Sequence, residues 1–377
     1  MGRYIARAAW EEGHILARRK AIKELVRSPS ADPLTRAKLQ LVLDARAFAE
    51  DSVGLKAGES FTTFSQLTTD TLVLVLAGAY RDELKSYTWW FPIVGRVPYK
   101  GFFDPADAER AARDLEQRGF DVYLRPASAF STLGWFNDPL LSTTLELDSA
   151  SLANTVVHEL THNTFYAPGQ AIFNESFANF VGSRGAMWYF RSRGDSVNER
   201  VSEEDWERDK IMGRFWEALY RSLDSAFTAH PDDRSARLAA ATAIYDHASE
   251  LYADSVAPSL PGYGSRPAVR PRLDNAILLA RRVYRTGLDE FDAVFALEGN
   301  DLERAMRQII ELAKSRPDDP YGALREWLAV RNPGSVATSS IAKPNSSRKA
   351  RTTSRRASSG DGALPPSSRS TDVITTP

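Results

Sequence analysis

Two histidines and two glutamates, all within eighteen residues, have the types and the spacing of a hydrolytic metal site. His158, Glu159 and His162 form an H-E-x-x-H pattern. On a helix, residues four apart share a face, so both imidazoles would point at one place with Glu159 beside them. Glu175 follows His162 by thirteen residues and is the nearest plausible third donor. Two histidines, one carboxylate and one open position are typical of a catalytic zinc rather than a structural one.

The chemistry expected of this site is hydrolysis of a peptide bond. Zinc (Zn2+) on these three ligands would lower the pKa of a bound water, and Glu159 would take its proton as the attack on a carbonyl begins. The same glutamate could then deliver that proton to the leaving amine. A further donor must stabilise the oxyanion. Tyr166, just past the first helix, and Tyr284, at the end of a later one, are the candidates, and each could equally be a packing tyrosine.

A second polar residue near the ligands is expected to orient them. Metal-bound imidazoles usually donate their other N–H to an acceptor. Asn179, one helical turn after Glu175, is therefore predicted to accept from His158 or His162, the alternative being an ordinary polar residue. The alternative to the whole metal site is a helix with a satisfied core histidine. It is disfavoured because burying two histidines and a glutamate without a metal costs on the order of several kcal/mol.

Helical patterns place these residues on two successive helices. The first is capped by Asp148 or Ser149 and runs to about Phe165, and the second spans Ile172 to Phe190 with Glu175 in its first turn. Pro168 and Gly169 separate the two. Apolar spacing and capping residues predict further helices at 4–27, 32–54, 104–119, 203–229, 232–254, 274–284 and 301–315.

Strand patterns are confined to the segment before the first of these helices. The run LVLVLAGAY at 72–80 is of strand length, and 89–103 is typical of two short strands or a bent hairpin. The unit 99–124 is predicted to be a strand, helix and strand crossover within a sheet of three to five strands. An extended substrate is expected to pair with an edge strand in the segment 131–136, a buried turn being the alternative. The residues proposed for this edge are Ser131, Thr132, Leu133, Gly134 and Trp135.

The composition is that of a globular protein. The 377 residues are 43% hydrophobic and 26% charged, and the formal net charge of −1 gives no reason to expect nucleic acid as a partner. There is no cysteine, and no apolar run approaches a membrane span. The first twenty residues carry charges throughout and do not form a signal peptide. As given, the sequence indicates a cytoplasmic protein, and a missing export signal would indicate the cell envelope or periplasm instead.

The expected fold is α+β and predominantly helical, with a small sheet in the N-terminal half packed against the H-E-x-x-H helix. One zincin-like domain is predicted over 1–333. Its parts are a sheet-containing region at about 70–140, the two metal helices at 148–190 and a helical remainder at 195–330. The segment 334–377 carries seven basic residues against two acidic ones and few large apolar side chains, so it is predicted to be a disordered tail.

The wider pattern resembles the gluzincin metallopeptidases and, more narrowly, the bacterial putative zinc aminopeptidase family. The segments that carry the resemblance are the helix end at 46–49, WWFPIVGRVPYKGFF at 89–103, AFSTLGWFNDPLLS at 129–142, VVHELTH at 156–162, FNESFANFVG at 173–182 and DNAILL at 274–279. The resemblance implies zinc on His158, His162 and Glu175, with Glu159 as the catalyst. Family members often carry two cysteines where this chain has Trp90 or Phe91 and Arg96, so a disulfide there is absent.

Exopeptidase action is implied by the resemblance alone. Holding a free α-amine requires carboxylates, and no acidic pair can be assigned to that task from the sequence. An endopeptidase of the same fold and a non-catalytic or regulatory zinc-binding protein remain the alternatives.

Overall fold

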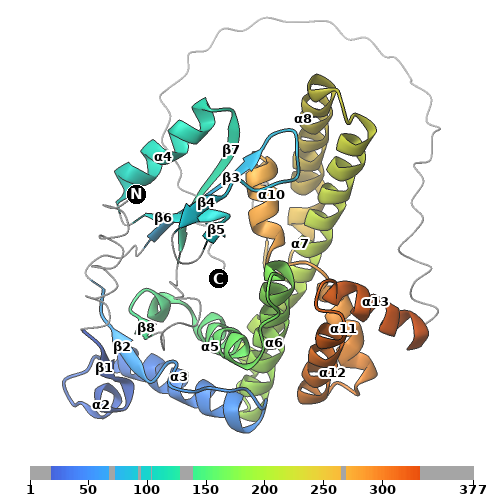
Figure 1. Cartoon of the computed structure of the whole chain (residues 1–377). Helices are drawn as coiled ribbons and strands as arrows, with labels where there is room; N and C mark the ends of the chain where they lie inside the picture. The colour runs from blue at the N-terminus through green and yellow to red at the C-terminus, as the bar shows by residue number, and fades with distance from the viewer. Residues whose placement is uncertain are drawn as a thin grey trace, which may run out of the picture.

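The computed structural model describes residues 18–67, 73–91, 95–102, 104–127, 139–264 and 269–331. Helices dominate this part of the chain, and the strands are short and lie in its N-terminal half, which confirms the predominantly helical α+β class. Figure 1 shows the sheet and its helix α4 on one side and the long helices on the other. None of the helices described has the length and apolar content needed to cross a membrane.

The main sheet has three strands in the order β6-β3-β7. The central strand β3 (Val73–Tyr80) is antiparallel to both β6 (Tyr99–Phe102) and β7 (Phe120–Ala127), so the two outer strands run in the same direction. Helix α4 (Pro105–Gln117) connects them across β3. The predicted strand, helix and strand crossover is therefore confirmed.

Local signals explain the bounds of α4. The side chain of Asp104 accepts hydrogen bonds from the backbone of Ala106 and Asp107, and Pro105 occupies the first turn, where its missing N–H costs nothing. Gly119 follows the helix with φ +85°, a conformation that favours glycine. The same chemistry starts α3 (Pro33–Asp51), because Asp32 accepts from Thr35 N at 2.9 Å just before Pro33.

Two smaller sheets complete the strands. β4 (Trp89–Phe91) and β5 (Gly95–Val97) form an antiparallel pair, which confirms the predicted bent hairpin. β1 (Lys20–Ala21), β2 (Thr63–Ser65) and β8 (Leu140–Leu141) form a second three-stranded sheet that was not predicted. Strands of two or three residues are too short to show a period of two in the sequence.

The expectation that the main sheet packs against the H-E-x-x-H helix is not shown by the main contacts between the described elements. That helix, α5 (Ser149–Thr164), packs against α6 (Ala171–Ser192), α3 (Pro33–Asp51) and α7 (Ser196–Ala229), whereas the sheet packs against α4 and α10 (Asn275–Arg282). The two regions have separate apolar cores. Val156 and Leu160 of α5 belong to the large helical core, whereas Leu76 and Phe102 of the sheet belong to a small core under α4.

The C-terminal part is helical, as predicted. The helices predicted at 203–229, 232–254, 274–284 and 301–315 are present, with bounds shifted by a few residues. The other elements are α2 (Ile22–Arg27), η1 (Thr144–Glu146), α8 (Arg234–Leu251), the π-helical turn η2 (Tyr252–Val256), α9 (Ala257–Ser259), α11 (Leu288–Leu297), α12 (Leu302–Ser315) and α13 (Pro320–Arg331). Helices α11 and α13 were not predicted. The predicted tail at 334–377, most of the helix at 4–27 and the substrate edge at Ser131 to Trp135 lie outside the described residues.

Candidate metal centre

Helix α5 presents the H-E-x-x-H residues because its two ends and its buried face fix its position. Asp148 caps it by accepting from Ser151 N at 2.9 Å and Ser151 Oγ at 2.8 Å, and the helix ends at Thr164. Leu152, Val156 and Leu160 are buried in the helical core. The H-E-x-x-H side chains are only partly buried, so they line the margin of that core.

The three predicted ligands meet at one place. His158 Nε2 lies 3.2 Å from His162 Nε2, and Glu175 Oε2 lies 3.4 Å and 3.7 Å from these two nitrogens. A tetrahedral zinc with bonds of about 2.0–2.2 Å separates its ligand atoms by about 3.3–3.6 Å. The three separations lie inside this range or within about 0.1 Å of it, and among the described residues the three side chains form a group of potential metal ligands.

Two glycines allow α6 to bring Glu175 over the histidines. A Cβ placed on Gly182 would lie 2.5 Å from Asn154 Oδ1 and 3.1 Å from His158 Cβ. A Cβ placed on Gly185 would lie 2.8 Å from Val157 Cγ1. Both glycines thus lie on the face of α6 that contacts α5, three residues apart. The sequence contains this signal as G-x-x-G, a spacing that marks close helix approach, but its role was not predicted.

The electrostatics of the cluster favour a cation. Burial by itself would raise the pKa of Glu175, but hydrogen bonds with His158 and His162 outweigh it and hold that pKa well below its ordinary value. Burial would likewise lower the pKa of His162, and the neighbouring Glu175 carboxylate raises it instead. A fixed negative charge at 3.4–3.7 Å from two imidazoles is therefore built into the site.

Glu159 has the freedom that a catalytic base requires. It is half-buried, and it forms neither a hydrogen bond nor an ion pair with the rest of the chain that the structure describes. Its negative charge nevertheless acts on His162 and on Tyr284. The carboxylate thus lies close enough for its charge to act on the ligand cluster, and it is not one of the three grouped side chains.

Of the two predicted oxyanion donors, Tyr284 is the better placed. Its ring centroid lies 6.4 Å from that of His158. Burial and the charge of Glu175 raise the pKa of its phenol, so the proton stays on the oxygen at neutral pH. Tyr166 is 57% exposed, just past the end of α5. Tyr99 of β6, which was not predicted, lies in the same region, because the charge of Glu175 raises the pKa of its phenol as it does that of Tyr284, and Tyr166 acts on it as well.

The backbone that carries Tyr284 is clamped to α6. Ser176 Oγ donates to the carbonyl of Val283 at 2.9 Å and accepts from the N–H of Thr286 at 3.0 Å. Ser176 directly follows Glu175 in the sequence. One helix therefore fixes both the carboxylate ligand and the segment that bears the tyrosine.

Asn179 belongs to this clamp rather than to the histidines. Its Nδ2 donates to the carbonyl of Tyr284 at 3.1 Å and to Asp209 Oδ2 at 2.9 Å. Asp209 also accepts from Arg285 Nε at 2.8 Å. The prediction that Asn179 accepts from His158 or His162 is not met among the described hydrogen bonds. The amide is instead held through its nitrogen, by the partly buried Asp209 carboxylate and the Tyr284 carbonyl, so its orientation is set by these two groups.

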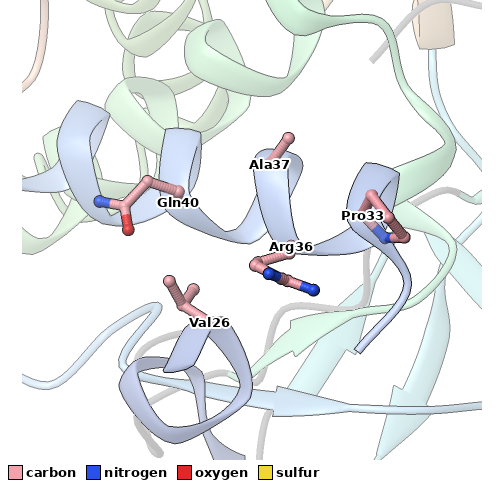
Figure 2. A pocket seen from close by; sticks show the side chains of 5 residues that line it. All are labelled: Val26, Pro33, Arg36, Ala37 and Gln40. Atoms are coloured by element: carbon pink, nitrogen blue, oxygen red, sulfur yellow. The ribbon is translucent and has the colours of Figure 1, made fainter. Parts of the chain in front are cut away.

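A hollow elsewhere on the molecule lacks such chemistry. It has a volume of about 270 Å³ beside α3 and is lined by Val26, Pro33, Arg36, Ala37 and Gln40 (Figure 2). None of these side chains is a histidine or a carboxylate. The candidate site is therefore the cluster on α5 and α6.

Fold and site together define a helical α+β protein in which two neighbouring helices gather two histidines and a glutamate. A family model described as "Putative aminopeptidase" matches residues 3–321. The chain belongs to this family, whose description indicates a peptidase and peptide hydrolysis. No curated protein and no solved structure matches the chain.

Proposed function

We propose that the protein is a zinc-dependent aminopeptidase with a zincin-like arrangement of its two metal helices. The observation that carries the proposal is the triangle of His158 Nε2, His162 Nε2 and Glu175 Oε2, with sides of 3.2, 3.4 and 3.7 Å. The donor set supports it as well, because two imidazoles and one carboxylate are the ligands of hydrolytic zinc sites. The family description supports the peptidase half of the proposal.

When bound, zinc would polarise a water molecule and the scissile carbonyl. Glu159 takes the proton of the attacking water, because its charge acts on His162 while the ligand triangle does not use it. It then returns the proton to the departing amine. Tyr284 keeps its phenolic proton at neutral pH and donates a hydrogen bond to the developing oxyanion.

The positions of these groups are set before substrate arrives. Ser176 and Asn179 hold the backbone on both sides of Tyr284 to the helix that carries Glu175. A donor fixed in this way requires little reorganisation during the reaction, and such preorganisation is the main source of electrostatic catalysis.

Replacing the base tests the proposal. Glu159→Gln preserves size and removes the proton acceptor, so turnover of aminoacyl or short peptide reporters is expected to fall by about 100-fold or more. Zinc content should remain that of the unaltered protein. Glu116→Gln, at an exposed position on α4, is the matched control and should keep full activity. Undiminished activity of Glu159→Gln would refute the mechanism, and zinc binding without turnover of any peptide would indicate a non-catalytic zinc protein.

A further inference from the structure

One arginine near the metal cluster has no counter-ion among the residues that the structure describes. Arg125 of β7 is half-buried, and it makes neither a hydrogen bond nor an ion pair with any residue that the structure describes. Other arginines of this region are paired. Arg282 Nε lies 3.0 Å from Glu217 and Arg285 Nε lies 2.8 Å from Asp209. A half-buried guanidinium without an acid is costly unless a ligand supplies the negative charge.

The strand register places Arg125 on the face of the sheet that looks towards the site. Alternate residues of β7, Phe120, Val122 and Leu124, pack in the core under α4. Side chains of a strand alternate, so Asp121, Tyr123 and Arg125 point to the opposite face. On β6, Tyr99 shares that face with Tyr123, because both are paired with Ala77 of β3.

Helix α10 fixes which end of that face lies near the metal ligands. At its start, Asn275 N donates to Asp121 at 3.1 Å, and near its end Arg281 lies 5.4 Å from the ring centroid of Tyr123. Helix and strand therefore lie side by side and run in the same direction. Arg125 is the next residue of the row beyond Tyr123, and Tyr284 follows the end of α10. The two are thus brought together.

Electrostatics agree with this placement. Burial raises the pKa of both Tyr284 and Tyr99. The positive charge of Arg125 lowers the pKa of each, so its guanidinium lies near both phenols. Among carboxylates, Glu175 acts on both phenols and Glu159 acts on Tyr284. Both glutamates already have roles, as ligand and as base. Among the described groups that act on these phenols, Arg125 is therefore a cation available to bind a ligand, whereas neither carboxylate is available.

We propose that Arg125 binds a carboxylate of the substrate, so that the protein acts on short peptides carrying a negative charge close to the scissile bond. The inference rests on the proposed peptidase function and assigns the substrate class to it. The carboxylate is either the free C-terminus of a very short peptide or an acidic side chain next to the cleaved bond. In both cases a guanidinium recognises it through paired N–H donors, which a lysine ammonium reproduces only in part.

Binding to zinc-loaded Glu159→Gln protein tests the inference without turnover. Isothermal titration calorimetry would compare three dipeptides: Ala-Ala, Ala-Ala amide and Ala-Glu amide. At least one of the two probes that carry a carboxylate is expected to bind about 10-fold to 100-fold more tightly than Ala-Ala amide, in line with charge-assisted hydrogen bonds. Preference for Ala-Ala would identify the C-terminus, and preference for Ala-Glu amide would identify a side chain.

Adding Arg125→Gln should reduce the ratio of the affinity for the preferred carboxylate probe to that for Ala-Ala amide to about 1. Arg125→Lys should keep part of this preference. Arg272→Gln is the control for net charge, because this exposed arginine acts on Asp121 and Asp274 at the opposite end of β7. It should keep the full preference. Circular dichroism and zinc content establish that each variant is folded and loaded.

Equal affinity for all three dipeptides, or an unchanged preference in Arg125→Gln, would overturn the inference. These outcomes are independent of catalysis. If the unaltered protein cleaved no peptide while the carboxylate preference appeared and depended on Arg125, the proposed hydrolysis would fail and the assigned ligand class would stand.

Discussion

The contact of Gly182 with α5 allows a prediction about how the metal centre is assembled. In Gly182→Ala, the new methyl would meet Asn154 Oδ1 at 2.5 Å, and the Asn154 carbonyl oxygen and His158 Cβ at 3.1 Å. Asn154 can rotate away only by breaking the hydrogen bond from its Nδ2 to Ser183 Oγ, which is 3.1 Å long. The remaining contacts force α6 away from α5 by a few tenths of an ångström. Overpacking of this kind costs about 1–3 kcal/mol of unfolding free energy.

The same displacement should weaken zinc binding. Metal sites tolerate deviations of only about 0.2 Å in their ligand distances, and Glu175 is carried by the helix that must move. We therefore expect the zinc dissociation constant to rise by about 10-fold or more, measured by competition with a chromophoric chelator. Thermal unfolding of the zinc-free protein measures the packing cost separately.

Two further variants control for overpacking alone. Gly185→Ala places a methyl 2.8 Å from Val157 Cγ1, which is not part of the ligand cluster, so it should lower stability with a smaller effect on zinc. Asn154→Ala combined with Gly182→Ala removes the closest contact and should recover part of the lost affinity. A folded Gly182→Ala protein with unaltered zinc affinity would refute the idea that the glycine sets the ligand geometry.

Two other predictions concern a tyrosine and a buried acid. Tyr284→Phe should lower kcat by about 100-fold with zinc retained, whereas Tyr166→Phe, at an exposed position, should have little effect; equal losses in steady-state assays would contradict the assignment. Asp274 caps α10 by accepting from Ile277 N at 2.9 Å, and burial followed by the nearby Asp121 raises its pKa to about 6. Because the native state then binds the proton of Asp274 more tightly than the unfolded state does, protonation of Asp274 stabilises the fold. This stabilisation is full below about pH 4 and is lost as the pH rises through about 6. Asp274→Asn keeps the cap and should remove this component, which is about 3 kcal/mol in all and about 1.4 kcal/mol between pH 5 and pH 7.5, from urea unfolding compared at these two pH values. An identical pH dependence in both proteins would contradict it.

Features set by neighbours along the chain were predictable. Asp32, Asp104 and Asp148 cap helices at the positions their sequence context indicated, because capping depends on the next three residues. The spacing of His158 and His162 likewise placed both on one helical face.

Contacts between distant segments were not predictable in the same way. Asn179 is one turn from Glu175, yet its amide bonds to Asp209 and Tyr284, which the sequence places far away. The main sheet faces α10 rather than α5, because its apolar core under α4 is separate from the helical core. Arg125 gave no signal of its own, since its significance depends on the register of β7 and on what lies at the end of α10.

The most direct test of the central account is the zinc content of two glutamine variants compared side by side. After loading with zinc and removal of the unbound metal, Glu159→Gln should retain one zinc per chain, because Glu159 is not a ligand. Glu175→Gln should retain far less, because it loses the charged oxygen that lies 3.4 Å and 3.7 Å from the two histidine nitrogens. Equal zinc content in the two variants, or loss confined to Glu159→Gln, would contradict the account.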